Sequence, residues 1–193
     1  MEPEVLAKDD ITGDTYQDFP DDQAPEGLSG PETLRIATEI KEFGNKAFKA
    51  KDLDLGIEKY QKALRYINEY PIRIDGDSDE LWAGLNSLKF TLHSNSALLQ
   101  NKTSCFRDAE ESAAKALEVE NLTNAEKAKA HFRRGVALAG LKDDLAAFDE
   151  IHTANKLMPG DKVIVAELKR LQKKKDDKKA KLKNYFNAGG VSA

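Results

Sequence analysis

One internal spacing occurs three times along this chain of 193 residues and constrains its fold more than any other feature. A small residue is followed 12, 16 and 19 positions later by three further residues, of which the first and last are small. The three sets are Gly44, Gly56, Tyr60 and Ala63; Ala97, Ala109, Ala113 and Ala116; and Gly135, Ala147, Ile151 and Ala154. Because two helices can approach closely only where side chains are small, the spacing predicts three successive pairs of packed helices.

The apolar residues recur with a period near 3.6, and no window of about eight residues shows convincing strand alternation. We therefore expect an all-α chain. The expected helices lie at about 31–50, 53–69, 78–101, 104–119, 123–140, 143–157 and 161–186. The short polar turns between them favour antiparallel neighbours.

The spacing is that of the tetratricopeptide repeat, a helix pair of about 34 residues. The third set also has the proline of that repeat, at Pro159. The anchors Gly44, Ala97 and Gly135 lie 53 and 38 residues apart, which predicts insertions. The larger insertion contains "YPIRIDGDSDELW" and should lengthen the helices and the loop between the first two repeats. We expect six antiparallel helices in a right-handed superhelix over 31–159, with repeats at about 37–70, 90–123 and 128–161, and then a long C-terminal helix.

The N-terminal residues have the composition of a linker. Residues 1–30 hold nine acidic residues against Lys8 alone, so we expect a flexible acidic segment. The start "MEPEVLAKDD" lacks the basic and apolar parts of a signal peptide, and no apolar run is long enough to span a membrane. A cytoplasmic protein with no membrane partner is expected. The single cysteine, Cys105, cannot form an internal disulfide and is predicted to be a small core residue.

The C-terminal residues are basic. Residues 161–193 hold ten Lys or Arg against four acidic residues. An apolar stripe should pack the start of the helix at 161–186 on the last repeat. The residues of this stripe are Ile164, Val165, Leu168 and Leu171. The stretch "QKKKDDKKAK" that follows has no stripe, so we expect part of the helix to project and residues 187–193 to form a flexible tail.

Longer motifs of the chain resemble a known family. The motifs "KEFGNKAF", "HSNSALL" and "KAHFRRGVAL", followed by a basic helix, look like the chaperone-binding module of the large immunophilins. The long loop after the first repeat and the acidic "DTYQDFPDDQ" are most similar to the forty-kilodalton cyclophilin type. The resemblance covers about residues 20–186. It implies a co-chaperone module of a peptidyl-prolyl cis-trans isomerase that acts in protein folding. The catalytic cyclophilin domain would precede residue 1, and no catalytic residue is expected within this chain.

In that family, a groove lined by the first helices of the repeats binds the acidic Met-Glu-Glu-Val-Asp C-terminus of the ninety-kilodalton heat-shock chaperone. The site is called a carboxylate clamp. By resemblance, the clamp residues of this chain are Lys41, Asn45, Asn95, Lys129 and Arg133. The first four would bind the terminal aspartate, and Arg133 would bind the peptide just upstream. Phe48 and Leu98, one turn beyond the asparagines, are candidates to line pockets for the peptide's apolar side chains.

The residue types suit this ligand independently of the family. A C-terminal aspartate carries two carboxylates, so its pocket needs cations together with neutral donors that add no like-charge repulsion. The i, i+4 spacing of each pair, Lys41 with Asn45 and Lys129 with Arg133, aims both members to one side of a helix. Taken singly, each residue is an ordinary solvated side chain, but the joint match at fixed offsets from the repeat anchors favours the clamp. Arg134 would point about 100° away from Arg133 and should matter less.

Other chemistry finds little support in the residues. His93, His131 and His152 lie on different predicted helices without the spacing of a zinc site, so we expect surface or groove histidines and no metal. The acidic "DGDSDE" mimics the start of a calcium loop, but Glu80 stands where the loop requires glycine and Asn86 where the last ligand should be glutamate. No cofactor or nucleophile motif is present. We expect no nucleic-acid partner, because the chain is acidic and lacks stacking aromatics near its lysines.

Two alternatives remain for the partner of this chain, which is expected to be a monomer. Some clamps prefer the C-terminus of the seventy-kilodalton chaperone, and the selection depends on the pocket for the upstream residues. Alternatively, the chain is a scaffold that acts through its convex face or through its basic C-terminal helix, for example as a calmodulin target.

Overall fold

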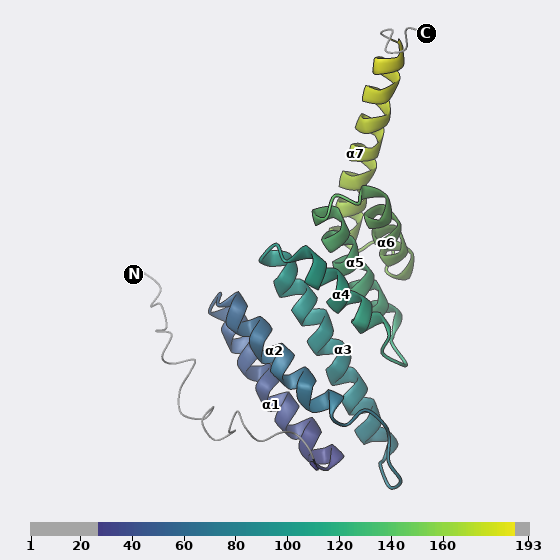
Figure 1. The fold of residues 1–193 in the computed structure, drawn as a ribbon. Helices are drawn as coiled ribbons and strands as arrows, with labels where there is room; N and C mark the ends of the chain where they lie inside the picture. The colour runs from purple at the N-terminus through teal and green to yellow at the C-terminus, as the bar shows by residue number, and fades with distance from the viewer. Residues whose placement is uncertain (1–26, 188–193) are drawn as a thin grey trace.

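The computed structural model describes residues 27–187, and this part of the chain folds into seven α-helices joined by loops (Figure 1). The helices are α1 (Gly30–Lys49), α2 (Leu53–Asn68), α3 (Asp79–Lys102), α4 (Phe106–Leu117), α5 (Asn124–Gly140), α6 (Asp144–Leu157) and α7 (Lys162–Asn187). Each boundary lies within two residues of the predicted one, and the all-α fold is confirmed. The rest of the expected linker and tail lies outside the described residues, so the division of the chain into domains stays a prediction.

Side chains at the helix starts explain where the helices begin. Ser29 and Glu32 form a capping box at α1, because Ser29 Oγ accepts the Glu32 backbone N–H and Glu32 Oε2 accepts the Ser29 backbone N–H at 3.1 Å. Thr123 and Glu126 repeat this arrangement at α5. Further capping side chains at α2, α3 and α6 belong to Asp52, Ser78 and Asp143. These caps satisfy backbone N–H groups that the first turn of a helix leaves without partners.

The small residues of the repeated spacing lie where paired helices cross. A Cβ atom on Gly44 of α1 would lie 2.6 Å from the ring of Tyr60 on α2. A Cβ atom on Gly135 of α5 would lie 2.7 Å from Ile151 on α6. Both glycines are therefore required for close approach. The predicted pairing of α1 with α2, α3 with α4, and α5 with α6 is confirmed.

The larger insertion lengthens α3, which has 24 residues and is the longest of the six repeat helices described. The loop before α3 is fixed by its own polar side chains. The Tyr70 hydroxyl donates to the Asp77 carboxylate at 2.9 Å, and Arg73 pairs with Asp79 at 2.7 Å. The first part of the predicted insertion, between α2 and α3, thus forms an ordered loop that leads directly into α3.

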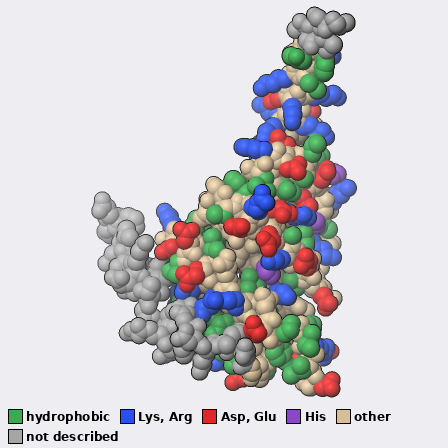
Figure 2. All heavy atoms as spheres, viewed as in Figure 1, with side chains coloured by type: hydrophobic (Ala, Val, Ile, Leu, Met, Phe, Trp, Pro, Cys, Tyr) green, Lys and Arg blue, Asp and Glu red, His purple; other side chains and the backbone are tan. Residues whose placement is uncertain are grey.

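The C-terminal helix has two different halves. Ile164 and Leu171 of α7 are buried against α5 and α6, together with Ile151. Residues 172–187 are exposed, and Figures 1 and 2 show this part of α7 projecting from the stacked helices with basic side chains along it. The predicted projection is confirmed. None of the helices in residues 27–187 combines the length and the apolar character needed to cross a bilayer.

Two single-residue predictions differ from the structure. Cys105 is exposed and not part of the core, because it occupies the N-cap position of α4 at the turn after α3. His93 is buried at 7% exposure, although a surface or groove residue was expected. Burial lowers the pKa of His93 to about 4, and the positive charges of Lys89 and Lys115 act in the same direction. The long α3 is covered along much of its length, so His93 faces inward.

Candidate functional site

The hydroxyl of Tyr60 on α2 is the centre of a polar cluster beneath the predicted clamp. Tyr60 is 2% exposed, and its hydroxyl donates to Asn45 Oδ1 on α1 at 2.8 Å. The side chain of Asn95 on α3 interacts with the same phenol. Burial raises the pKa of Tyr60, which keeps the hydroxyl protonated and able to donate. The clamp asparagines of the first and second repeats therefore meet at one buried group.

The hydrogen bond from Tyr60 also sets the orientation of the Asn45 amide. With Oδ1 engaged by the phenol, Asn45 Nδ2 faces the other way and donates to Glu42 Oε2 at 3.0 Å. The ammonium of Lys41 lies 2.9 Å from Glu42 Oε1. Hydrogen bonds from Lys41 and Asn45 hold the pKa of the Glu42 carboxyl below its usual value. The first-repeat pair thus already binds a carboxylate, one that belongs to the chain itself.

Arg133 on α5 enters the site from the third repeat. One guanidinium nitrogen donates to Ser94 Oγ on α3, and Asn101 Nδ2 donates to the Arg133 backbone carbonyl at 2.9 Å. Burial lowers the pKa of Arg133 to about 10, while Tyr60 raises it. At neutral pH the guanidinium therefore stays charged. Ser94 holds the guanidinium against α3, and Asn101 of the same helix holds the Arg133 backbone.

The remaining candidates lie on the same helices, each about one turn from Asn45, Asn95 or Arg133 in the sequence. Lys129 is exposed one turn before Arg133 and makes no ion pair with any residue in 27–187. Phe48 is 37% exposed on α1, and Leu98 is partly buried on α3. Asn45 and Asn95 are therefore linked through Tyr60, and Arg133 is bound to Ser94, whereas Lys129 is placed only by its helix. The roles of all seven residues as peptide contacts stay predictions.

Sequence reasoning did not single out three residues of this cluster for the site. Tyr60 was noted only as the large packing residue of the first repeat. Ser94 stands directly before Asn95 in the sequence. Its burial, at 1% exposure, indicates that its hydroxyl needs a partner, but the sequence does not give this burial. Glu42 lies between Lys41 and Asn45 in the sequence. The sequence therefore gives its charge near these two residues but not its contacts with them.

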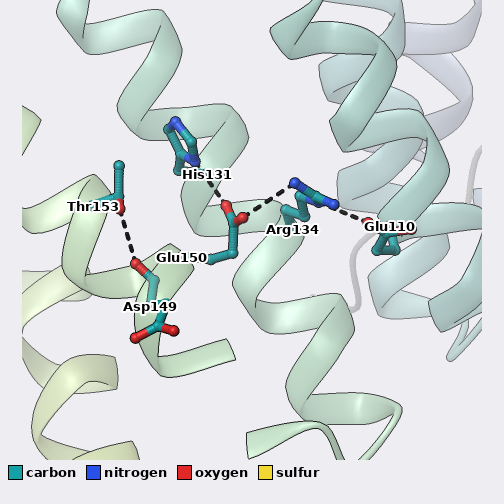
Figure 3. Close-up of polar contacts among 6 residues, drawn as sticks. All are labelled: Glu110, His131, Arg134, Asp149, Glu150 and Thr153. Carbon is teal, nitrogen blue, oxygen red and sulfur yellow. Dashed lines mark hydrogen bonds and ion pairs between the residues drawn. The ribbon is translucent and has the colours of Figure 1, made fainter. Parts of the chain in front are cut away.

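Arg134 has a different position from its neighbour Arg133. Figure 3 shows its guanidinium between two acidic residues, with Nε 2.7 Å from Glu110 on α4 and a second nitrogen 3.2 Å from Glu150 on α6. His131 Nδ1 lies 2.7 Å from the other oxygen of Glu150. Arg134 therefore connects the second and third repeats through α4 and α6, whereas the guanidinium of Arg133 contacts α3.

The chain is similar to several known proteins, although no protein-family model matches it. Peptidyl-prolyl cis-trans isomerase D of Cryptococcus neoformans is 33% identical over 179 residues, which are 90% of this chain and 48% of that protein. The chain thus spans about half the length of the curated relatives it matches.

Solved structures share the fold. The C-terminal tetratricopeptide-repeat domain of a Plasmodium falciparum protein described as FK506-binding superposes with a TM-score of 0.69 at 23% identity, over 81% of this chain and 99% of that one. The myosin chaperone UNC-45 of C. elegans, solved in complex with an Hsp90 peptide, has a TM-score of 0.58 at 34% identity, over 74% of this chain and 14% of that one. The predicted fold of three tetratricopeptide repeats and a C-terminal helix is confirmed, and the curated relatives are peptidyl-prolyl isomerases.

Proposed function

We propose that this chain is a co-chaperone module that binds the acidic C-terminus of the ninety-kilodalton heat-shock chaperone through a carboxylate clamp. The proposal rests on one observation: Asn45 and Asn95 of the first two repeats meet at the buried Tyr60 hydroxyl, and Arg133 of the third repeat is held against α3 by Ser94, the neighbour of Asn95. Lys41 and Lys129 supply further cations from α1 and α5. A peptide that ends in aspartate brings two carboxylates to these donors.

The contacts of Glu42 support the same ligand chemistry. Lys41 and Asn45 each contact one oxygen of this carboxylate, which supports their assignment as a pair that binds a carboxylate together. Charge-assisted hydrogen bonds contribute about 1.5–3 kcal/mol each, so several of them suffice for a short peptide. The similarity to UNC-45, which was solved with an Hsp90 peptide, adds support at 34% identity. The similarity to curated isomerases supports a parent protein with peptidyl-prolyl isomerase activity outside this chain.

Calorimetric titration with the Met-Glu-Glu-Val-Asp peptide tests the proposal. We expect a Kd on the order of micromolar, which corresponds to about 8 kcal/mol of binding free energy. Amidation of the peptide C-terminus removes one carboxylate and should weaken binding roughly ten- to a hundredfold. Equal affinity for the amidated peptide would show that no carboxylate clamp operates.

The preferred chaperone is a finer question for the same assay. Peptides with the C-terminal sequences of the ninety- and seventy-kilodalton chaperones share the terminal aspartate, so the clamp alone should not distinguish them. Selection depends on contacts upstream, for which Phe48 and Leu98 are the candidates. If the seventy-kilodalton sequence binds more tightly, the partner assignment changes while the clamp remains.

A second candidate function uses the projecting part of α7. Residues 172–187 are exposed and carry a run of lysines, which suits an acidic protein partner such as calmodulin. Removal of residues 172–193 should abolish binding of such a partner and leave the affinity for the acidic peptide unchanged. Binding of calmodulin to the truncated chain would exclude α7 as its site.

A further inference from the structure

The carboxylate of Glu42 occupies the donors that the first repeat would present to a ligand. Its Oε1 lies 2.9 Å from Lys41 Nζ, and its Oε2 accepts from Asn45 Nδ2 at 3.0 Å. Both oxygens are therefore engaged, by the two residues that the clamp assigns to the first repeat. The groove without peptide contains a compensated ion pair at this position and not a free cation.

A peptide carboxylate cannot simply join this arrangement. Two carboxylates on one ammonium would lie a few ångströms apart, where like charges repel each other. Asn45 Nδ2 keeps a second N–H, but the Tyr60 hydroxyl fixes the amide through Oδ1 at 2.8 Å, so a second carboxylate bound there would lie beside that of Glu42. Glu42 itself has freedom to leave, since its side chain is 55% exposed and can turn into solvent.

From these contacts we infer that Glu42 is an internal competitor for the clamp, which a bound peptide displaces from Lys41 and Asn45. The inference rests on the proposed function. Displacement makes the observed affinity lower than that of a groove without this carboxylate, because part of the binding free energy is used to break the internal contacts. Glu42 thereby sets the affinity for acidic C-termini without contributing a contact to them.

Glu39 offers a matched control on the same helix. It lies about one turn before Glu42 on α1 and pairs with Arg35 at 2.8 Å, not with Lys41 or Asn45. Glu42→Gln and Glu39→Gln each remove one negative charge from α1. A general gain in attraction for an acidic peptide would appear in both variants, whereas relief from competition would appear only in Glu42→Gln.

The experiment compares the free and amidated Met-Glu-Glu-Val-Asp peptides on the native chain and on both variants. Exposed ion pairs are worth up to about a fivefold change in an equilibrium constant, so Glu42→Gln should bind the free peptide about two- to fivefold more tightly. Glu39→Gln should match the native affinity. Unchanged or weaker binding by Glu42→Gln, or an equal gain in Glu39→Gln, overturns the inference.

A titration of the Glu42 carboxyl by nuclear magnetic resonance tests the displacement directly in the native chain. Without peptide its pKa is lowered by Lys41 and Asn45, and on peptide binding it should rise toward the ordinary value. A pKa that does not rise means that Glu42 stays in place. If the native chain loses affinity on amidation but shows neither effect of Glu42, only this inference fails. If amidation has no effect, the proposed function fails with it.

Discussion

The first and third repeats have the same spacing of packing residues but use it differently. In the first repeat, Gly44 packs against the ring of Tyr60, and the Tyr60 hydroxyl donates a hydrogen bond to Asn45 of the predicted clamp. In the third repeat, Gly135 packs against Ile151, whose aliphatic side chain has no polar group to offer. The residue that closes the first helix pair therefore also orients a ligand-binding amide, while its counterpart serves packing alone.

In the third repeat, the clamp residue Arg133 is oriented by residues of the adjacent repeat. Arg133 is fixed by Ser94 and Asn101, both of which belong to the second repeat. A clamp residue can thus be positioned from within its own helix pair or from the adjacent pair. Peptide binding by Asn45 therefore depends on the stability of the first repeat. Peptide binding by Arg133 depends on how the second and third repeats stack.

Acidification should have the largest effect of the changes considered, a loss in the free energy of unfolding. It tests whether the first and third repeats unfold together. His93 lies between them, with a pKa of about 4 when folded and an ordinary value of 6.5. Above pH 6.5 it is neutral in both states. As the pH falls from 6.5 toward 4, the unfolded chain binds a proton that the folded chain does not, and the free energy of unfolding falls by up to about 3 kcal/mol.

Denaturant unfolding at several pH values measures this loss, and His93→Gln should remove most of the pH dependence. Hydrogen exchange in α2 and α6 should accelerate together if the repeats form one cooperative unit. Exchange that accelerates in one helix only would show that the two repeats unfold independently.

Removing the lysine from each clamp pair should weaken peptide binding by about 1.5–3 kcal/mol, which is roughly ten- to a hundredfold. Lys129→Ala should cost more than Lys41→Ala, because Lys41 must first release Glu42 whereas Lys129 has no ion pair with a described residue. Lys46→Ala is the control, since this exposed lysine of α1 lies over the Phe43 ring at 5.1 Å. A large loss with Lys46→Ala would point to general electrostatic attraction instead of a clamp.

Gly44→Ala and Gly135→Ala each add a methyl group at a helix crossing, and the overpacking should destabilise the fold by about 1–3 kcal/mol. The higher helix propensity of alanine offsets about 1 kcal/mol of this loss. Gly44→Ala should also weaken peptide binding, because a displaced Tyr60 ring moves its hydroxyl away from Asn45. Gly135→Ala should leave peptide affinity nearly unchanged in the folded fraction. Thermal unfolding and titration below the melting temperature distinguish the two variants, and equal losses of affinity would remove the difference between the repeats.

Tyr60→Phe isolates the hydroxyl and has the smallest expected effect. Packing is retained, and the lost hydrogen bond should cost about 1 kcal/mol in peptide binding, or roughly fivefold. Ile151→Val, at the equivalent position of the third repeat, should lower stability by about 0.5–1.5 kcal/mol with no change in affinity. The comparison is wrong if Tyr60→Phe binds the peptide as tightly as the native chain does.

The helices and their pairing were predictable because periodicity and small residues encode them directly. Gly44 and Gly135 mark the crossings by their size alone, and the i, i+4 spacing of Lys41 and Asn45 gives their direction on α1. The contacts that orient the site were not predictable in this way. The bond between Ser94 and Arg133 joins residues 39 positions apart, and it depends on how deeply two stacked helices bury them.

The misplaced residues have a similar cause. His93 and Cys105 were assigned from residue type, but their exposure follows from the extent of α3 and from the turn that ends it. Glu42 could be located on the correct helix, yet its rotamer decides whether it meets solvent or Lys41. Sequence thus indicates which face a residue occupies more readily than which partner it finds there.

The packed half of α7 also covers the end of the three repeats described. In a solenoid, each added helix pair presents a new apolar end face that the next pair must cover. Ile164 and Leu171 cover that face on the third repeat, and the lysine-rich residues 172–181 that follow offer no apolar stripe on which a fourth could pack. Because a run of lysines separates the packed stripe of α7 from Leu182, Tyr185 and Phe186, the helix ends the stack at the third repeat in the part of the chain that the structure describes.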